Sequence, residues 1–253
     1  MSQIPVTLAE RPEWEAQIPR LHSESWPTFI QADPVAMRYW GELFSTFAEY
    51  QYVLCDDHDT LIAAGHAIPL VWDGTIEGLP EGWDAAIERG FRDYEHGEAP
   101  TALCGLSIVI APTQQGRGLS EMMVRTMKDI AAADGLGQII IPVRPSLKSR
   151  HPLVPIQEYI QWQQPDGSPF DPWLRMHQRM GAEILTIAPR SMVITGTVEQ
   201  WEQWTGMRFP ESGPYPVPGA LEPIIIDCEH NSGRYEESNV WVRYAGIASP
   251  FSA

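Results

Sequence analysis

The spacing of apolar residues predicts helices in the first fifth of the chain. A helical period runs through residues 12–49 and is interrupted near Pro27 and Pro34. Asp33 is the expected N-cap of the second helix, because its carboxylate can accept hydrogen bonds from the free amides of the first turn. Pro34, which follows it, suits the first helical position. The pattern therefore predicts two consecutive helices before residue 50.

The period then changes to that of β-strands. Apolar runs over 52–55 and 61–72 flank the polar stretch DDHDT and predict a β-hairpin. A helix is expected over 81–95, within an insertion that spans 74–100.

The centre of the chain combines two buried strands with an amphipathic helix. Residues 102–111 form a nearly continuous apolar run that stops before Pro112, and residues 138–143 form a second run. Such runs suit strands that are covered on both faces. The helix between them has one apolar stripe, made of Leu119, Met122, Met123, Met127, Ile130 and Ala131. A strand, a helix and a strand in this space predict a right-handed parallel crossover.

The next segment begins with a proline-rich connection over 144–170, which is long enough to be a lid or a binding segment. A helix is expected over 171–180, with Asp171 as its N-cap. Residues 182–188 and 191–198 are expected to form two antiparallel strands that pair with each other.

The chain ends in a proline-rich tail with two expected strands, at 223–228 and 240–244. We expect an α/β core over residues 1–205 and a C-terminal extension, 206–253, that packs on this core. Because the tail strands offer free edges, they could pair between two copies of the chain and form a homodimer.

Composition and charge narrow the class of protein. Hydrophobic residues make up 43% of the chain, enough for a packed core. The formal net charge of -16 argues against a nucleic-acid partner, whose phosphates attract clustered Lys and Arg. The three cysteines are far apart, no apolar run is long enough for a membrane helix, and the N-terminus lacks the apolar segment of a secretion signal. We therefore expect a cytoplasmic protein that binds no metal, nucleic acid or membrane.

The turn Gln115–Ser120 is the candidate ligand site. Gly116 and Gly118 let the main chain approach a ligand without a Cβ clash. The helix that follows leaves unpaired N–H groups in its first turn, and its dipole favours an anion there. The turn therefore predicts a phosphate site. Neither GxGxxG nor GxxxxGK[ST] occurs in the chain, which argues against a Rossmann or P-loop nucleotide site.

The residues Gln115-Gly116-Arg117-Gly118-Leu119-Ser120 resemble motif A of the GNAT acyltransferase superfamily, usually written Q/R-x-x-G-x-G/A after a strand that ends in proline. Ser120 departs from the usual small residue at the last position. The later stretch MHQRMG at 176–181 is similar to the Y-x-x-x-G pattern of the family. The resemblance covers about residues 50–195. It implies the GNAT fold, a mixed twisted sheet flanked by helices.

The resemblance also implies how the protein works. An acyl-CoA, acetyl-CoA in the first place, would place its pyrophosphate on the Gln115–Ser120 turn. Its pantetheine arm would pair with the preceding strand at Ser107, Ile108, Val109 and Ile110. The amine of a small-molecule acceptor would attack the thioester directly, without an acyl-enzyme intermediate.

Two histidines are the candidate catalytic residues. His177 stands where the family has a tyrosine that protonates the departing thiolate, and histidine can supply a proton near neutral pH; alternatively, it caps its helix. His66 lies in the strand whose counterpart borders the acceptor pocket in the family. It is the candidate base or, alternatively, a hydrogen-bonded core histidine. Asp73 and Glu158 are further candidates for the base.

Some alternatives stay open. The polar cluster of Ser146, Lys148, Arg150 and His151 would bind a coenzyme phosphate or an acceptor carboxylate, or else form a solvated loop. The fold would also serve a transferase with another donor or an O-acceptor, or a non-catalytic sensor of CoA or of a metabolite.

Overall fold

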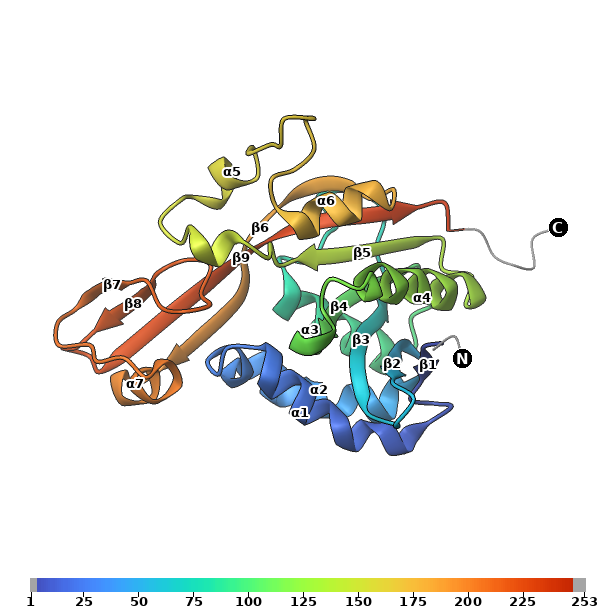
Figure 1. Ribbon diagram of the computed structural model, residues 1–253, viewed down its shortest axis with the longest axis horizontal. Coiled ribbons are helices and arrows are strands. Elements are labelled where there is room, and N and C mark those ends of the chain that lie inside the picture. Colours follow the sequence, from blue (N-terminus) through green and yellow to red (C-terminus); the bar gives the residue numbers. More distant parts are fainter. Residues whose placement is uncertain (1–3, 248–253) are drawn as a thin grey trace.

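Nine strands form a single mixed sheet in the computed structural model, which describes residues 4–247 (Figure 1). The strands are β1 (Val6–Thr7), β2 (Gln51–Cys55), β3 (Leu61–Leu70), β4 (Ala102–Ile110), β5 (Gln138–Val143), β6 (Glu183–Gly196), β7 (Gly213–Tyr215), β8 (Ile224–Asp227) and β9 (Ser232–Ala245). Their order is β1-β2-β3-β4-β5-β9-β8-β7, and β6 pairs with the other edge of β9. Among the described pairs, β4 and β5 are parallel and the others are antiparallel. The predicted mixed sheet and parallel crossover are thus confirmed.

Helices cover both faces of this sheet. They are α1 (Ile18–Ser25), α2 (Pro34–Thr46), α3 (Trp83–Glu95), α4 (Leu119–Ala133), α5 (Ile156–Tyr159), α6 (Pro172–Arg179) and α7 (Val198–Thr205). None of these helices has the length and apolar content that a bilayer crossing requires, within the part of the chain that the structure describes.

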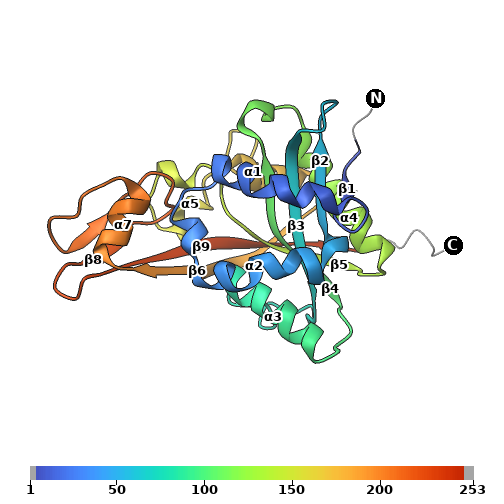
Figure 2. The ribbon, with the colours of Figure 1, turned by 90° about the horizontal axis from the view of Figure 1, so that it is seen from below.

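The two faces carry different helices. On one face, α1 packs on β3 and β4 through a cluster that includes Leu21, Ala64 and Val109. The helices α2 and α3 lie on this same side, from which Figure 2 views the molecule. On the opposite face, Met127 of α4 lies against Gly105 of β4. Because the Lys128 ammonium of α4 donates to a carbonyl at the end of α6 (2.8 Å), α4 and α6 share that second face.

Two helices begin as the sequence predicts. The Oδ1 atom of Asp33 accepts hydrogen bonds from the amides of Val35 (2.9 Å) and Ala36 (2.8 Å), with Pro34 at the first helical position. Asp171 caps α6 in the same way. Both predicted N-caps are therefore confirmed, since local chemistry suffices to set them.

The predicted strand pair at residues 182–198 is wrong. The segment forms one continuous strand, β6, whose partner is β9. A register shift between Ala188 and Met192 lies where the sequence suggested a turn. Pro189 has no N–H to donate, and an irregularity in the ladder accommodates it without reversing the chain. The final strand is also much longer than the predicted 240–244.

The sheet crosses the boundary that we expected at residue 205. β9 lies between β5 and β6, so the last strand belongs to the centre of the sheet. The outer ends of β6 and β9 carry β7, β8 and α7 as an arm, on the left in Figure 1. Both β8 and β9 pair on two edges within the chain, so neither offers a free edge for the expected homodimer. Residues 1–3 and 248–253 of the expected ranges lie outside the described residues.

The connection over 144–170 is anchored to the rest of the chain. Lys148 is buried, and its ammonium donates to the carbonyls of Leu221 (2.6 Å) and His151 (3.1 Å). The Tyr159 hydroxyl donates to Asp171 (2.8 Å). Two of the three N–H groups of the Lys148 ammonium are therefore taken by main-chain carbonyls, and the side chain does not lie in the solvated loop that was the alternative.

A buried ion pair ties the start of this connection to β9. Arg144 Nε lies 2.9 Å from both carboxylate oxygens of Glu237, whose side chain is fully buried. A further Arg144 N–H donates to the carbonyl of Gly219 (2.6 Å).

We expect Arg144→Met to lower the free energy of unfolding by about 3–5 kcal/mol, because it leaves the Glu237 charge buried without a counter-charge. Arg234→Met is the matched control, since Arg234 pairs with the half-exposed Glu236 on the same strand and such pairs contribute about 1 kcal/mol or less. Urea unfolding of both variants measures the difference. Equal losses of unfolding free energy in the two variants would contradict the prediction, because they would show that removal of Arg144 does not leave an uncompensated charge at Glu237.

Candidate active site

The strands β4 and β5 separate in the middle of the sheet. Their parallel pairing is limited to Leu103 with Ile139 and Cys104 with Ile140. In the β3–β4 ladder, the register shifts so that Leu106 is an extra residue on β4. Beyond this point, the β5-facing edge of β4 has main-chain groups that β5 does not bind. That edge can receive an extended ligand by strand-like hydrogen bonds.

At the end of β4, the glycine turn leads directly into α4. Gly116 has φ of 76° and Gly118 has φ of 78°, so both adopt the left-handed conformation that glycine favours. A Cβ atom at either position would meet nothing within 4 Å, so the main chain is accessible there. Gly118 is the N-cap of α4 and makes no side-chain cap, which leaves the first amides of the helix to a ligand.

The other residues of the predicted coenzyme site lie along the same path. Gln115 is directed back to β4, where its side-chain amide donates to the Ile110 carbonyl (3.4 Å). Arg117 is exposed and hydrogen-bonds Gln114, while Leu119 and Ser120 form the half-buried first turn of α4. Along β4, Ser107 and Ile108 are half-buried and Val109 and Ile110 are buried, so the latter two offer a ligand mainly their main-chain atoms.

His66 lies beside this opening. It pairs in register with Ser107, whose hydroxyl is buried and has no hydrogen-bond partner among the described residues. The His66 ring is fully buried, and its Nδ1 lies 3.1 Å from the side-chain oxygen of Gln51. Both amide protons of Gln51 are donated elsewhere, to the carbonyls of Phe47 and Ala67. The Gln51 oxygen therefore accepts, and His66 Nδ1 carries the proton.

The partner of His66 is a second histidine, which the sequence analysis missed. His22 of α1 places its Nε2 atom 3.2 Å from His66 Nε2. Because His66 Nε2 bears no proton in this tautomer, His22 Nε2 must donate. The Nδ1 atom of His22 then has a free lone pair, and no described residue forms a hydrogen bond with it. Burial lowers the pKa of His22 to about 4, and burial followed by the nearby His22 charge lowers the pKa of His66 well below its usual value.

Both rings are neutral at physiological pH, and in the hydrogen bond between them His22 is the donor and His66 the acceptor. Protonation of His22 at Nδ1 would produce an imidazolium whose Nε2–H still binds His66. Both ring nitrogens of His66 already take part in hydrogen bonds, to Gln51 and to His22. His66 therefore does not take a proton directly, as we had expected, but supports His22. A signal for His22 exists in the sequence, because it lies four residues after Ile18 on the apolar stripe of α1.

His177 lies elsewhere, on the α6 face. Its ring is buried, Nδ1 lies 2.8 Å from the Tyr244 hydroxyl, and Nε2 has no partner among the described residues. Burial, and then the charge of Lys128, lower the pKa of His177 to about 3. The ring is therefore neutral near pH 7. The expected proton donor is then a neutral imidazole N–H and not an imidazolium.

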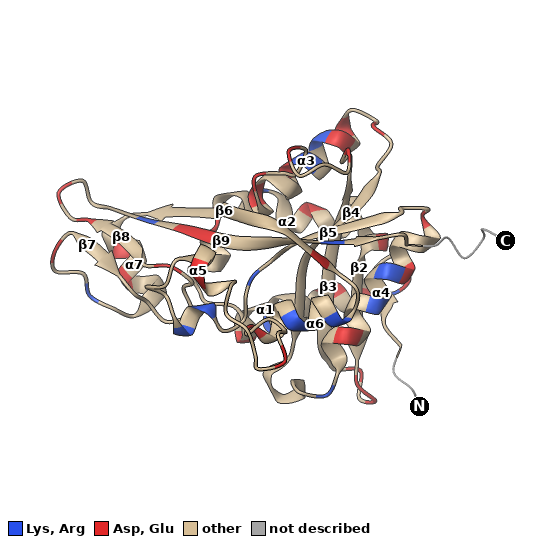
Figure 3. Ribbon diagram, turned by 90° about the horizontal axis from the view of Figure 1, so that it is seen from above, with Lys and Arg blue, Asp and Glu red and all other residues tan. Residues whose placement is uncertain are grey.

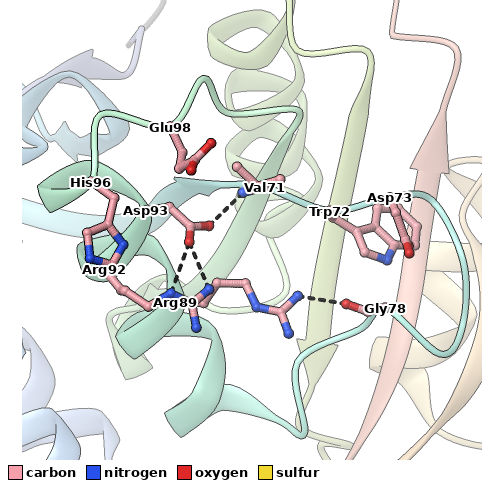
Figure 4. Close-up of a pocket in the computed structure, with 9 residues that line it drawn as sticks. All are labelled: Val71, Trp72, Asp73, Gly78, Arg89, Arg92, Asp93, His96 and Glu98. Carbon is pink, nitrogen blue, oxygen red and sulfur yellow. Dashed lines mark hydrogen bonds and ion pairs between the residues drawn. The ribbon is translucent and has the colours of Figure 1, made fainter.

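A hollow of about 430 Å³ lies at the far end of β3, beside α3 (Figure 4). Asp73, one of the further base candidates, lines it and lies beyond the end of β3 at Leu70, whereas His66 lies in the middle of that strand. Three charged groups of this hollow are engaged locally. Asp93 accepts from the Val71 amide and from Arg92, and Arg89 donates to the Gly78 carbonyl.

Charges are also paired between α4 and α6, where Lys and Arg gather (Figure 3). Arg179 lies 2.7 Å from Glu121 and Arg125 lies 3.6 Å from the same carboxylate. Residues 4–247 contain no group of three or more His, Cys, Asp or Glu arranged to hold a metal ion.

Known proteins resemble the chain in sequence and in fold. The arginine N-acetyltransferase avaD of Aspergillus versicolor is 33% identical over 267 residues, which cover 93% of this chain and 91% of that protein. The loading GNATL domain of CurA from Lyngbya majuscula superposes with a TM-score of 0.57 at 16% identity, over 92% of this chain and 93% of that domain. The GphF GNAT-like decarboxylase, solved with isobutyryl-CoA, gives a TM-score of 0.54 at 14% identity, over 92% and 95%. No protein-family model matches the chain.

The open β4–β5 edge, the glycine turn and the extent of these similarities define the class together. The chain belongs to the GNAT superfamily, and it is an acyl-CoA-dependent N-acetyltransferase that acts on an amine. The predicted fold class and reaction type are thus confirmed.

Proposed function

We propose that acetyl-CoA binds across the opening between β4 and β5. The amides that follow Gly116 and Gly118 bind the pyrophosphate, and the main chain of Ser107–Ile110 pairs with the pantetheine arm. Three observations support this placement: the positive φ angles of both glycines, the free space around them and the end of strand pairing after Cys104. The thioester carbonyl then lies near Ser107, on the level of His66.

In the transfer step, the acceptor nitrogen attacks the carbonyl carbon of the thioester. A C–N bond forms, the C–S bond breaks, and the amine loses one proton while the thiolate gains one. We assign the departing amine proton to His22 Nδ1, directly or through one water molecule. His66 and Gln51 are positioning residues, because they fix the tautomer in which that nitrogen is free. The His22 ring is neutral near pH 7, so the lone pair of its Nδ1 atom is available before the reaction.

For the proton that the thiolate gains, His177 remains the candidate. Its Nε2 atom is the ring position without a partner among the described residues. If the Tyr244 hydroxyl donates to Nδ1, Nε2 carries a proton that a sulfur atom can accept.

The acceptor is a small molecule, and we propose arginine, acetylated on its α-amine. The proposal comes from the relative avaD, which is named an arginine N-acetyltransferase and matches nearly the whole chain. The formal charge of -16 agrees with a cationic acceptor.

A transfer assay tests this function. Purified protein is incubated with acetyl-CoA and L-arginine, release of free CoA is followed, and the product is identified by mass and fragmentation. We expect one acetyl group on the α-nitrogen and no acetylated arginine without the protein. CoA release that does not depend on arginine would contradict the proposed acceptor.

A further inference from the structure

Arg144 combines a structural ion pair with free hydrogen-bond donors. Its Nε atom binds the Glu237 carboxylate, and its Nη2 atom donates to the Gly219 carbonyl (2.6 Å). Since a guanidinium has five N–H groups, these contacts leave both protons of Nη1 and one of Nη2. The side chain is 20% exposed, and Nη1 is not fully buried and forms no hydrogen bond within residues 4–247. The outer end of the guanidinium is therefore open to a ligand.

The ion pair with Glu237 does not use up the charge of Arg144. Glu237 also accepts hydrogen bonds from the Tyr235 hydroxyl (2.8 Å) and from the side-chain amide of Asn239 (3.1 Å). Three donors thus share this one carboxylate, and Arg144 contributes its Nε side to it. Nη1 and the second proton of Nη2 point away from the chain in one plane, an arrangement that fits the two oxygens of a carboxylate.

Strand alternation places Arg144 on the face of the sheet that carries the histidine pair. Gly105 faces α4, and a Cβ atom there would lie 3.0 Å from Ile141 Cγ1, so Ile141 faces α4 as well. Successive side chains of a strand point to opposite faces, so Arg144, three residues further, points to the other face. His66 also points there, because it meets His22 of α1.

Trp26 connects Arg144 to the histidine pair. The guanidinium carbon of Arg144 lies 5.7 Å from the centre of the Trp26 ring. Trp26 follows the last turn of α1, and its amide donates to the His22 carbonyl (2.8 Å). Residues four apart at the surface of a helix are neighbours, about 5–6 Å apart at Cβ. Because all three side chains are half-buried, they form one accessible row.

We propose that Arg144 binds the α-carboxylate of an amino-acid acceptor and thereby directs the α-amine toward His22. The proposal rests on the proposed N-acetyltransferase activity on arginine and adds the residue that selects an α-amino acid over a simple amine. Arg144 follows β5, which parts from β4 after Ile140, so it borders the opening to which the thioester is assigned. The amine and the carboxylate of an amino acid share one carbon atom. A carboxylate held in two hydrogen bonds therefore fixes the direction of the amine.

Substrate analogues test the proposal on the unchanged protein. L-Argininamide has a neutral amide in place of the carboxylate, and agmatine lacks the group altogether. In the wild type we expect kcat/KM for L-arginine to exceed that for either analogue about 10- to 100-fold, as for loss of a hydrogen bond between charged groups. The amine of argininamide is less basic than that of arginine, so basicity alone would favour the amide. Equal kcat/KM values for the three compounds would overturn the proposal.

Arg144→Lys removes the free end of the guanidinium and keeps a cation for Glu237. We expect the ratio of kcat/KM for arginine to that for argininamide to fall toward one, mainly through a higher KM for arginine. Arg89→Lys is the matched control, because Arg89 is another half-buried guanidinium bound to a main-chain carbonyl, in the hollow beside α3. We expect it to keep the wild-type ratio. A ratio that falls in Arg89→Lys and persists in Arg144→Lys would place the carboxylate in that hollow and overturn the proposal.

Calorimetry with free CoA, which has no acetyl group to transfer, separates carboxylate binding from the reaction. We expect the wild type to bind L-arginine more tightly than argininamide, and Arg144→Lys to bind the two with similar affinity. This result without acetylation of arginine in the transfer assay would support the carboxylate site and contradict the proposed acceptor. Acetylated arginine, together with equal affinities of the wild type for both compounds, would support the acceptor and overturn the site. No binding of L-arginine by the wild type would contradict both.

Discussion

Replacing His22 with alanine is expected to lower kcat about 10²- to 10³-fold, with little change in the dissociation constant of acetyl-CoA. The reason is that His22 Nδ1 is the free basic nitrogen of the histidine pair, and general-base catalysis typically contributes this much. His66→Ala should lower kcat to a similar extent, because loss of its Nε2 removes the acceptor that orients His22. Steady-state kinetics on acetyl-CoA and arginine measure both effects, with calorimetry for coenzyme binding.

The double variant gives the sharper result. If the two rings act as one unit, His22→Ala/His66→Ala is expected to be no slower than either single variant. His58→Ala is the control, since His58 lies exposed in the β2–β3 turn. Multiplication of the two single effects would show that the histidines act independently and would contradict the assigned hydrogen-bonded unit.

The pKa of His22 adds a stability readout. Its folded-state pKa of about 4 is below the usual value of 6.5, so the unfolded chain binds more protons between these pH values. His22 therefore costs stability as pH falls from about 6.5 to 4, with a limiting slope of about 1.4 kcal/mol per pH unit. Urea unfolding of His22→Ala should show a flatter decline over this range than the wild type.

The second large effect concerns the glycine turn. Gly118→Val is expected to weaken acetyl-CoA binding about 100-fold, equivalent to about 2.7 kcal/mol. The φ of 78° is unfavourable for a β-branched residue, and the new side chain would enter the open space where the helix amides face the pyrophosphate. Calorimetric titration with acetyl-CoA measures the loss.

Gly135→Val is the matched control at the other end of α4. Gly135 has φ of 71°, and a Cβ atom at this position would likewise meet nothing within 4 Å, so the backbone strain is comparable. We expect both variants to lose about 1–2 kcal/mol of stability, and only Gly118→Val to lose the coenzyme. Equal affinities in the two variants would mean that the pyrophosphate does not lie on this turn.

Local signals predicted much of the fold. The N-caps Asp33 and Asp171, the helices around them and the strands β2 to β5 follow from spacing and from residues that interact within one helical turn or one strand. The pairing of β6 with β9 could not be predicted in this way. Its two strands are separated by α7, β7 and β8, and an apolar strand does not specify a partner so distant along the chain.

The same distinction between local and long-range information holds for the candidate site. The sequence alone determined the glycine turn, because positive φ angles, a helix N-terminus and a preceding buried strand are properties of consecutive residues. It also identified His66 as a residue of interest but not its role. Only the tertiary structure decided that His22, 44 residues away, meets His66. Burial and tautomer depend on which distant segments pack together, and no local pattern contains that information.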